Sequence, residues 1–171
     1  MRYSDSELRF LLFAALFPFL FAACSFDDKI DTTFDPCSPL TIVPGSNSEP
    51  HELQSIEDAI LAWNQVLPTR IEIGPPLGAG GELRILFEPG NTYFRAIYLD
   101  KPGKILISRE NLAAKDLPLA IAHELGHAFG LWHVPIEERA SIMNVGNLDL
   151  VPGPEDAFAV SALWDSCNQT P

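Results

Sequence analysis

The clearest hydrophobic pattern in the chain lies between Glu49 and Val66. Apolar residues recur there at intervals of three and four positions, which is the spacing of one face of an α-helix. The recurring positions are Leu53, Ile56, Ile60, Trp63 and Leu67. Ser48 stands just ahead as a candidate N-cap, and Pro68 stops the pattern. We therefore predict a first helix over about residues 49–66.

Short apolar runs bounded by Gly, Pro or Asn predict β-strands. One run precedes the first helix, and four follow it before the next helical segment. The predicted strands are Leu40–Val43, Arg70–Ile73, Leu83–Phe87, Arg95–Leu99 and Lys104–Ser108. Loops rich in Gly and Pro separate them, and residues 100–103 form a predicted turn.

Two further helices are predicted after the strands. Asp116 caps the first of them, Pro118 lies in its first turn, and Gly130 ends it. The last helix covers about Pro154–Trp164, after a Pro-Gly-Pro sequence. Its core candidates are Phe158, Leu163 and Trp164.

The composition fits one exported domain. The chain has 171 residues, 47% of them hydrophobic, which is enough for one core. The apolar stretch Phe10–Ala23 is too short to span a bilayer and indicates a signal peptide over residues 1–23. Residues 24–39, rich in Asp, Thr and Pro, are predicted to be a tether. The folded domain is predicted over residues 40–171.

The small residues before Cys24 resemble a bacterial lipoprotein signal, in which that cysteine becomes the lipidated amino terminus. The resemblance implies a lipoprotein on the cell envelope, in the outer membrane if the cell is Gram-negative. An ordinary secretory signal cut nearby is the alternative. Lipidation of Cys24 would leave Cys37 and Cys167 to form a disulfide in an oxidising compartment, or to persist as unpaired thiols.

The net charge excludes some partners. A formal charge of −12 disfavours nucleic acid and anionic lipid, because both would repel the chain. Membrane attachment would therefore depend on a lipid anchor. We expect a monomer that binds protein or peptide substrates.

The segment HELGHAFGLWH, residues 123–133, carries the candidate chemistry. His123 and His127 are four positions apart and project from one face of a helix. Gly130 suits a left-handed helix end, after which the chain turns back and His133 supplies a third ligand. Three neutral imidazoles leave one zinc position for water, and Glu124 is placed to act as the general base. The alternative is a helix that holds structural histidines and no metal.

HExxHxxGxxH is the signature of the metzincin metallopeptidases, and Ser141–Asn144 resembles their Met-turn. The chain is most similar to the matrixin branch. The resemblance implies an α+β metzincin-type zincin domain. Its twisted, mostly parallel sheet would have an antiparallel edge strand and would pack on a long first helix and the active-site helix, with a C-terminal helix added. It also implies that Met143 forms a hydrophobic floor below one catalytic zinc.

The same resemblance implies how a substrate would bind. An extended peptide would pair with the edge strand, for which we expect Ala96–Leu99. The active-site helix and residues 144–150 would wall a pocket for a substrate side chain.

Three departures from metzincin patterns shape the prediction. His51 is the only other histidine and is predicted on the surface of the first helix, so no second zinc is expected. Val145 stands where other metzincin branches have a tyrosine. The cysteine-switch motif is absent from the sequence, although Cys37 could in principle bind the zinc as a thiolate. The sequence does not show whether calcium binds the loops.

The sequence thus predicts a zinc-dependent endopeptidase that cuts extracellular or envelope proteins. Two alternatives belong to other classes. One is a zinc-containing surface lipoprotein that binds peptides without cutting them. The other is a structural lipoprotein without metal.

Overall fold

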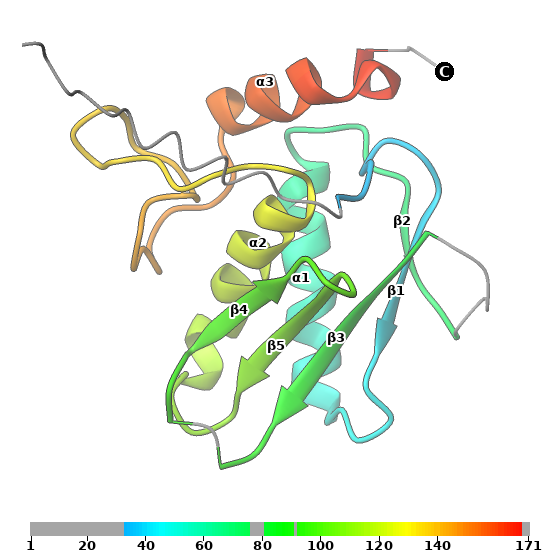
Figure 1. Ribbon diagram of the computed structural model, residues 1–171, viewed down its shortest axis with the longest axis vertical. Coiled ribbons are helices and arrows are strands. Elements are labelled where there is room, and N and C mark those ends of the chain that lie inside the picture. Colours follow the sequence, from blue (N-terminus) through cyan, green and yellow to red (C-terminus); the bar gives the residue numbers. More distant parts are fainter. Residues whose placement is uncertain (1–32, 76–80, 91, 169–171) are drawn as a thin grey trace, which may run out of the picture.

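The computed structural model describes residues 33–75, 81–90 and 92–168. These residues form an α+β fold with five strands and three α-helices (Figure 1). The strands are β1 (Leu40–Pro44), β2 (Ile71–Ile73), β3 (Glu82–Glu88), β4 (Ala96–Leu99) and β5 (Lys104–Ser108). The helices are α1 (Pro50–Asn64), α2 (Leu117–Ala128) and α3 (Pro154–Leu163), with short 3₁₀ turns at Ala114–Asp116 and Asp165–Asn168. The predicted signal peptide and Cys24 lie outside the described residues.

The sheet has the strand order β2-β1-β3-β5-β4. Neighbouring strands run parallel except for β4, which runs antiparallel to β5 at one edge. In β3, residues alternate between buried and more exposed, and Leu83, Ile85 and Phe87 point into the core. The predicted mostly parallel sheet with an antiparallel edge strand is therefore confirmed.

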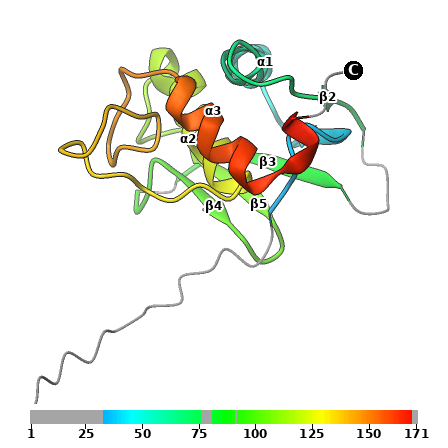
Figure 2. The ribbon, with the colours of Figure 1, turned by 90° about the horizontal axis from the view of Figure 1, so that it is seen from above.

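Helices α1 and α2 lie together on one face of the sheet (Figures 1 and 2). Trp63 of α1 is fully buried, and its indole N–H donates a hydrogen bond of 2.9 Å to the carbonyl of Ala122 in α2. The same indole meets the ring of Phe129 edge-on at 5.3 Å. These contacts fix α2, which carries the histidine motif, against α1 and the sheet.

The start of α1 differs from the prediction. The N-cap is Glu49 and not Ser48, because the backbone N–H of Glu49 donates to the Glu52 carboxylate at 2.7 Å. Glu52 is 1% exposed and also accepts two hydrogen bonds from Arg109, at 2.6 and 2.9 Å. His51 lies on the exposed side of this first turn, as predicted.

The core face of α3 was predicted wrongly. Phe158 is 77% exposed and Leu163 is 54% exposed, whereas Ala157 and Val160 are buried. The helix is apolar on several sides, so its pattern did not determine which side faces inward. Trp164 is partly buried, and its indole N–H donates a hydrogen bond to the backbone carbonyl of Phe129.

A disulfide joins Cys37 to Cys167, which is one of the two arrangements that the sequence left open. It links positions 130 residues apart. Close to it, the N–H of Phe34 donates to the carbonyl of Ala128 at 2.7 Å. The two ends of the domain therefore meet near the end of α2, and Cys37 has no free thiol with which to bind a metal.

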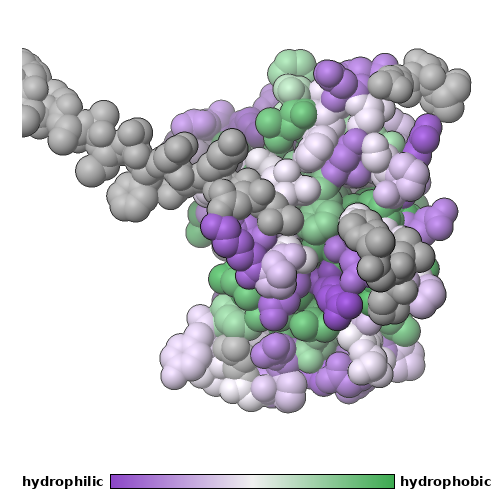
Figure 3. All heavy atoms as spheres, turned by 45° about the vertical axis from the view of Figure 1, so that its right-hand side comes forward, coloured by the Kyte–Doolittle hydropathy of each residue, from purple (hydrophilic) through white to green (hydrophobic). Residues whose placement is uncertain are grey.

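None of the helices formed by the described residues has the length and apolar character needed to cross a membrane. The face drawn in Figure 3 mixes hydrophilic and hydrophobic residues. A net charge of −12 accompanies this mixed surface.

Candidate metal centre

Three imidazoles converge beside α2. The Nε2 atoms of His123 and His133 are 3.2 Å apart, and those of His127 and His133 are also 3.2 Å apart. His123 and His127 lie one helical turn apart on α2, and His133 comes from the segment after the helix. Each residue offers a ligand atom, and the three atoms lie within 4.8 Å of one another. The triad could therefore hold a metal ion, as the sequence predicted.

Backbone carbonyls fix the orientation of two of the rings. Nδ1–H of His123 donates to the carbonyl of Ile142 at 2.7 Å, and Nδ1–H of His127 donates to the carbonyl of Leu131 at 2.8 Å. A carbonyl can only accept, so the proton of each neutral ring is on Nδ1 and the lone pair is on Nε2. The lone pairs of both rings consequently belong to the atoms that converge.

Burial of the imidazole rings favours the neutral form of all three histidines. It is the main cause that lowers the pKa of His123 and His133 below the ordinary value, and it lowers that of His127 to about 4. A protonated imidazole has no lone pair to donate to a cation. At neutral pH the histidines are thus in the form that binds a metal.

The end of α2 brings the third histidine back to the first two. Gly130 has φ +99°, a conformation that a side chain would strain. The N–H of Gly130 donates to the backbone carbonyl of His127, and the N–H of Leu131 donates to the carbonyl of Gly126. This is the hydrogen-bond pattern of a Schellman motif. The chain reverses here as predicted, and the carbonyl of Leu131 becomes the partner of His127.

Glu124 lies next to the histidines and lines the same cleft. Its side chain is mostly removed from water, with the residue only 6% exposed. Burial raises the pKa of Glu124 to about 7, and a hydrogen bond from the backbone of Tyr98 acts in the opposite direction. A buried carboxyl group that touches edge strand β4 thus stands beside the imidazoles.

Met143 packs against the helix that carries the histidines. It is fully buried, and a Cβ atom built on Gly126 would overlap its Sδ atom. Gly126 lies between His123 and His127 on α2, so the thioether fills the space next to the helix backbone at this point. Met143 therefore packs against the part of α2 that lies between His123 and His127.

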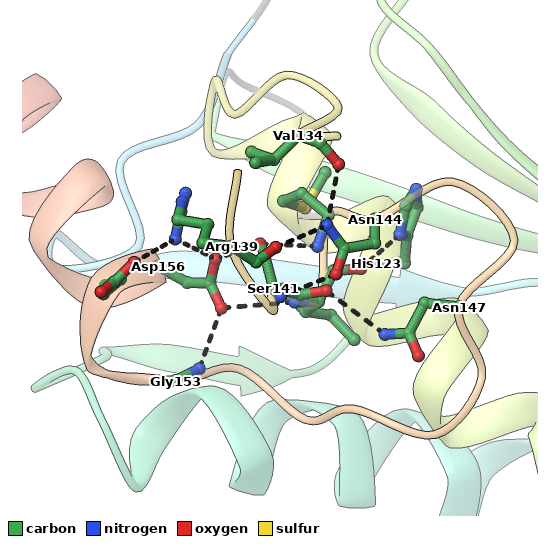
Figure 4. Close-up of polar contacts among 11 residues, drawn as sticks. His123, Val134, Arg139, Ser141, Asn144, Asn147, Gly153 and Asp156 are labelled. Carbon is green, nitrogen blue, oxygen red and sulfur yellow. Dashed lines mark hydrogen bonds and ion pairs between the residues drawn. The ribbon is translucent and has the colours of Figure 1, made fainter. Parts of the chain in front are cut away.

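Asp156 holds the loop before Met143 in place (Figure 4). Its carboxylate accepts hydrogen bonds from the Ser141 hydroxyl and from the backbone N–H groups of Ile142 and Gly153, the latter two at 3.3 and 3.0 Å. Arg139 pairs with the same carboxylate at 3.2 Å. Because the carbonyl of Ile142 is the partner of His123, Asp156 helps to orient the ring of His123.

Asn144 forms a second set of bonds within this loop (Figure 4). Its side-chain oxygen accepts from the backbone N–H of Ser141 at 2.8 Å. Its amide group donates to the carbonyls of Val134 and Arg139, at 2.8 and 3.0 Å. These roles of Asn144 and Asp156 were not predicted from the sequence, in which the one relevant feature is the pair of acidic residues in the first turn of α3.

A cleft of about 740 Å³ surrounds the triad and Glu124. One wall is β4, through Ala96, Ile97 and Tyr98, and another is formed by residues 146–148. Both segments lie within the ranges that the sequence assigned to substrate binding. Leu112 and Ala120 are among the apolar residues that line it.

No protein-family model matches the chain, and a search of curated proteins found no match either. The chemistry of the site therefore rests on its residues and their geometry.

Proposed function

We propose that this protein is a zinc-dependent endopeptidase of the metzincin type, similar to the matrixins. The observation that carries the proposal is the convergence of the Nε2 atoms of His123, His127 and His133 beside buried Glu124, in a cleft that runs along an edge strand.

The donor set fits zinc. Two nitrogens bound to a tetrahedral zinc at about 2.0–2.1 Å lie about 3.3 Å apart. The two Nε2 separations of 3.2 Å agree with this value. Neutral imidazoles suit zinc, and a hydrogen bond from the other ring nitrogen to a carbonyl is the usual support for such a ligand. His123 and His127 both have that support.

Glu124 would move the proton in the reaction. When bound, zinc would supply a Lewis acid that polarises a peptide carbonyl and lowers the pKa of a water molecule toward neutrality. The Glu124 carboxylate would accept a proton from the attacking water and pass it to the nitrogen of the leaving amine. Its burial and its hydrogen bond to the Tyr98 backbone would hold the carboxylate in position for both transfers.

The substrate would be an extended peptide. Strand β4 is the last strand of the sheet order, and an extended peptide would add to its outer edge as a further strand. The cleft beside β4 contains the triad, and a peptide paired with this strand would therefore pass the metal centre. Main-chain pairing accepts many sequences, and side-chain pockets would set the preference.

The proposal includes export. Cys24 would be lipidated and would attach the domain to the cell envelope through the residues before Phe34, because Phe34 and Cys37 already bond within the domain. Incorporation of a radiolabelled fatty acid into the wild-type chain, and its loss in Cys24→Ser, would support this attachment. Release of an unlabelled wild-type protein into the medium would instead support an ordinary secretory signal.

Glu124→Gln tests the proposed mechanism. We expect this variant to keep its fold and its zinc, measured by elemental analysis, and to lose peptide cleavage by a factor on the order of 10² to 10⁴. His127→Ala should lose the zinc as well. His51→Ala is the matched control, because this histidine is exposed and outside the cleft.

The outcomes separate the alternatives. Cleavage by Glu124→Gln at the wild-type rate would contradict the mechanism. A wild-type protein that binds zinc and peptides but cuts none of a broad peptide library would favour the peptide-binding lipoprotein. A protein that takes up no zinc would favour the structural lipoprotein.

A further inference from the structure

A second cavity lies next to the substrate cleft, and one residue, Leu112, lines both. The second cavity has a volume of about 250 Å³. Leu112 is 8% exposed and packs in the hydrophobic core. Leu112 therefore lies where the two spaces adjoin.

Helix α2 shows how the two cavities are arranged. Leu117 lines the second cavity, and Ala120, one turn further along the helix, lines the cleft. Residues three positions apart lie on the same side of a helix. The cavities thus follow one another along one side of α2, with Leu112 lining both.

The part of the cleft at Leu112 is suited to a substrate side chain. Ala120 lies three and four positions before His123 and Glu124, so it adjoins them on the helix. Its small side chain leaves room, and Leu148 adds a further apolar surface to the same cleft. A peptide on β4 would direct alternate side chains toward and away from α2. A side chain next to the bond being cut would enter this apolar part.

We propose that Leu112 limits the length of the substrate side chain that enters the cleft beside the scissile bond. This inference rests on the proposed function. Wild-type protein would prefer an apolar side chain of moderate length, such as leucine, and would discriminate against longer ones that meet Leu112. Shortening Leu112 would join the cleft to the second cavity and relax this limit.

The second cavity is able to receive an apolar extension. Phe87, Ala114 and Leu117 provide apolar walls. Exposed Glu49 and His51 also line the cavity. Its buried carboxylate, Glu52, is paired with Arg109 at 2.6 Å, so no unpaired charge of that pair would face the incoming group. A longer aromatic side chain would therefore be accommodated once the Leu112 side chain is removed.

The experiment compares Leu112→Ala with wild-type protein on peptides that differ at one position. The series contains leucine, phenylalanine, homophenylalanine and 4-phenylphenylalanine at the residue beside the bond that wild-type protein cuts. We expect the ratio of kcat/KM for the longest side chain to that for leucine to rise at least about tenfold in Leu112→Ala. Leu112→Phe should lower the ratio for phenylalanine and longer side chains.

Leu117→Ala is the matched control, because Leu117 is 4% exposed and lines the second cavity without lining the cleft. It loses the same atoms from the core and should keep the wild-type ratio within about twofold. Should Leu112→Ala fail to fold, as judged by its unfolding transition, Leu112→Val replaces it, with a smaller shift expected in the same direction. A wild-type ratio in the folded Leu112 variant, or an equal shift in Leu117→Ala, would overturn the proposal.

Binding separates this inference from the proposed function. The affinities of the same peptides are measured for zinc-loaded Glu124→Gln with and without Leu112→Ala. If wild-type protein cuts nothing, the side-chain series is placed at each position of a peptide that it binds. A gain in affinity for long side chains at one position in the double variant would then support the length limit, and the lack of cleavage would refute only the peptidase proposal. Cleavage by wild-type protein without any shift at Leu112 would refute only the length limit.

Discussion

Replacing Gly126 with alanine tests the packing below the metal centre. A Cβ atom at this position would overlap Met143 Sδ and would lie 3.2 Å from Met143 Cε and 3.4 Å from Trp63 Cζ2. Both neighbours are fully buried. Trp63 is further held by its hydrogen bond to Ala122, so the thioether of Met143 has to move.

Two effects of opposite sign decide the stability of Gly126→Ala. Alanine in place of glycine favours a helix interior by about 1 kcal/mol. Overpacking of a filled core costs about 1 to 3 kcal/mol. Because the overlap is with a buried atom, we expect overpacking to win and the free energy of unfolding to fall by about 1 kcal/mol. Metal affinity should fall as well, since Met143 is adjacent to Ile142, the partner of His123.

Urea unfolding of the metal-free proteins measures this change, and competition with a chelator measures the metal affinity. Gly74→Ala is the control, because its Cβ would meet only Thr41 Cγ2 at 3.4 Å, an ordinary contact. In a Met143→Ala background the overlap disappears, so Gly126→Ala should there be neutral or stabilising. A stabilising effect of Gly126→Ala in the wild-type background would contradict the overlap with Met143.

Three other predictions concern the fold around the site. Replacing Cys37 and Cys167 together with serine should destabilise the domain by about 5 kcal/mol in the chain-entropy model, because the disulfide closes a loop of 130 residues; an unchanged urea midpoint would contradict this. Burial raises the pKa of Glu52, but its hydrogen bonds to Arg109 and the backbone outweigh burial and lower it below the ordinary 4.5. The Glu52–Arg109 pair should therefore stabilise the fold above about pH 4.5, and this stabilisation should be lost as the pH falls through the lower pKa of folded Glu52. The difference in free energy of unfolding between wild-type protein and Glu52→Gln should consequently become smaller in acid. Gly130→Ala should lower the free energy of unfolding by about 1 kcal/mol, because φ at this position is +99°. It should also weaken metal binding, because the turn that carries His133 would be displaced. A metal affinity equal to that of wild-type protein would argue against this role of the turn.

The sequence pattern predicted the elements that position the triad. The interval of four between His123 and His127, and the glycine at position 130, are local features whose geometry follows from the helix itself. Strand β5 was predicted with its observed bounds, and the other strands were predicted to within one residue at each end. These elements depend on contacts close in sequence or on strong apolar runs, which is why they could be predicted.

Long-range contacts explain what the sequence did not predict. The cap of α1 depends on Glu52, whose carboxylate also binds Arg109, 57 positions later. The inward side of α3 places Asp156 against Ser141, so a polar contact fixes the helix while Phe158 lies in solvent. Neither contact has a periodic signature in the chain.

Zinc titration of the metal-free protein, with peptide cleavage measured at each point, is the most direct test of a single catalytic zinc. We expect cleavage of a peptide library to be absent without zinc, to rise as zinc is added, and to reach its maximum at one equivalent per chain. We also expect Glu124→Gln to bind the same single equivalent without cleavage. Binding of one zinc by wild-type protein with no cleavage of any peptide would contradict the proposed peptidase activity, and failure to bind zinc would contradict the metal centre itself.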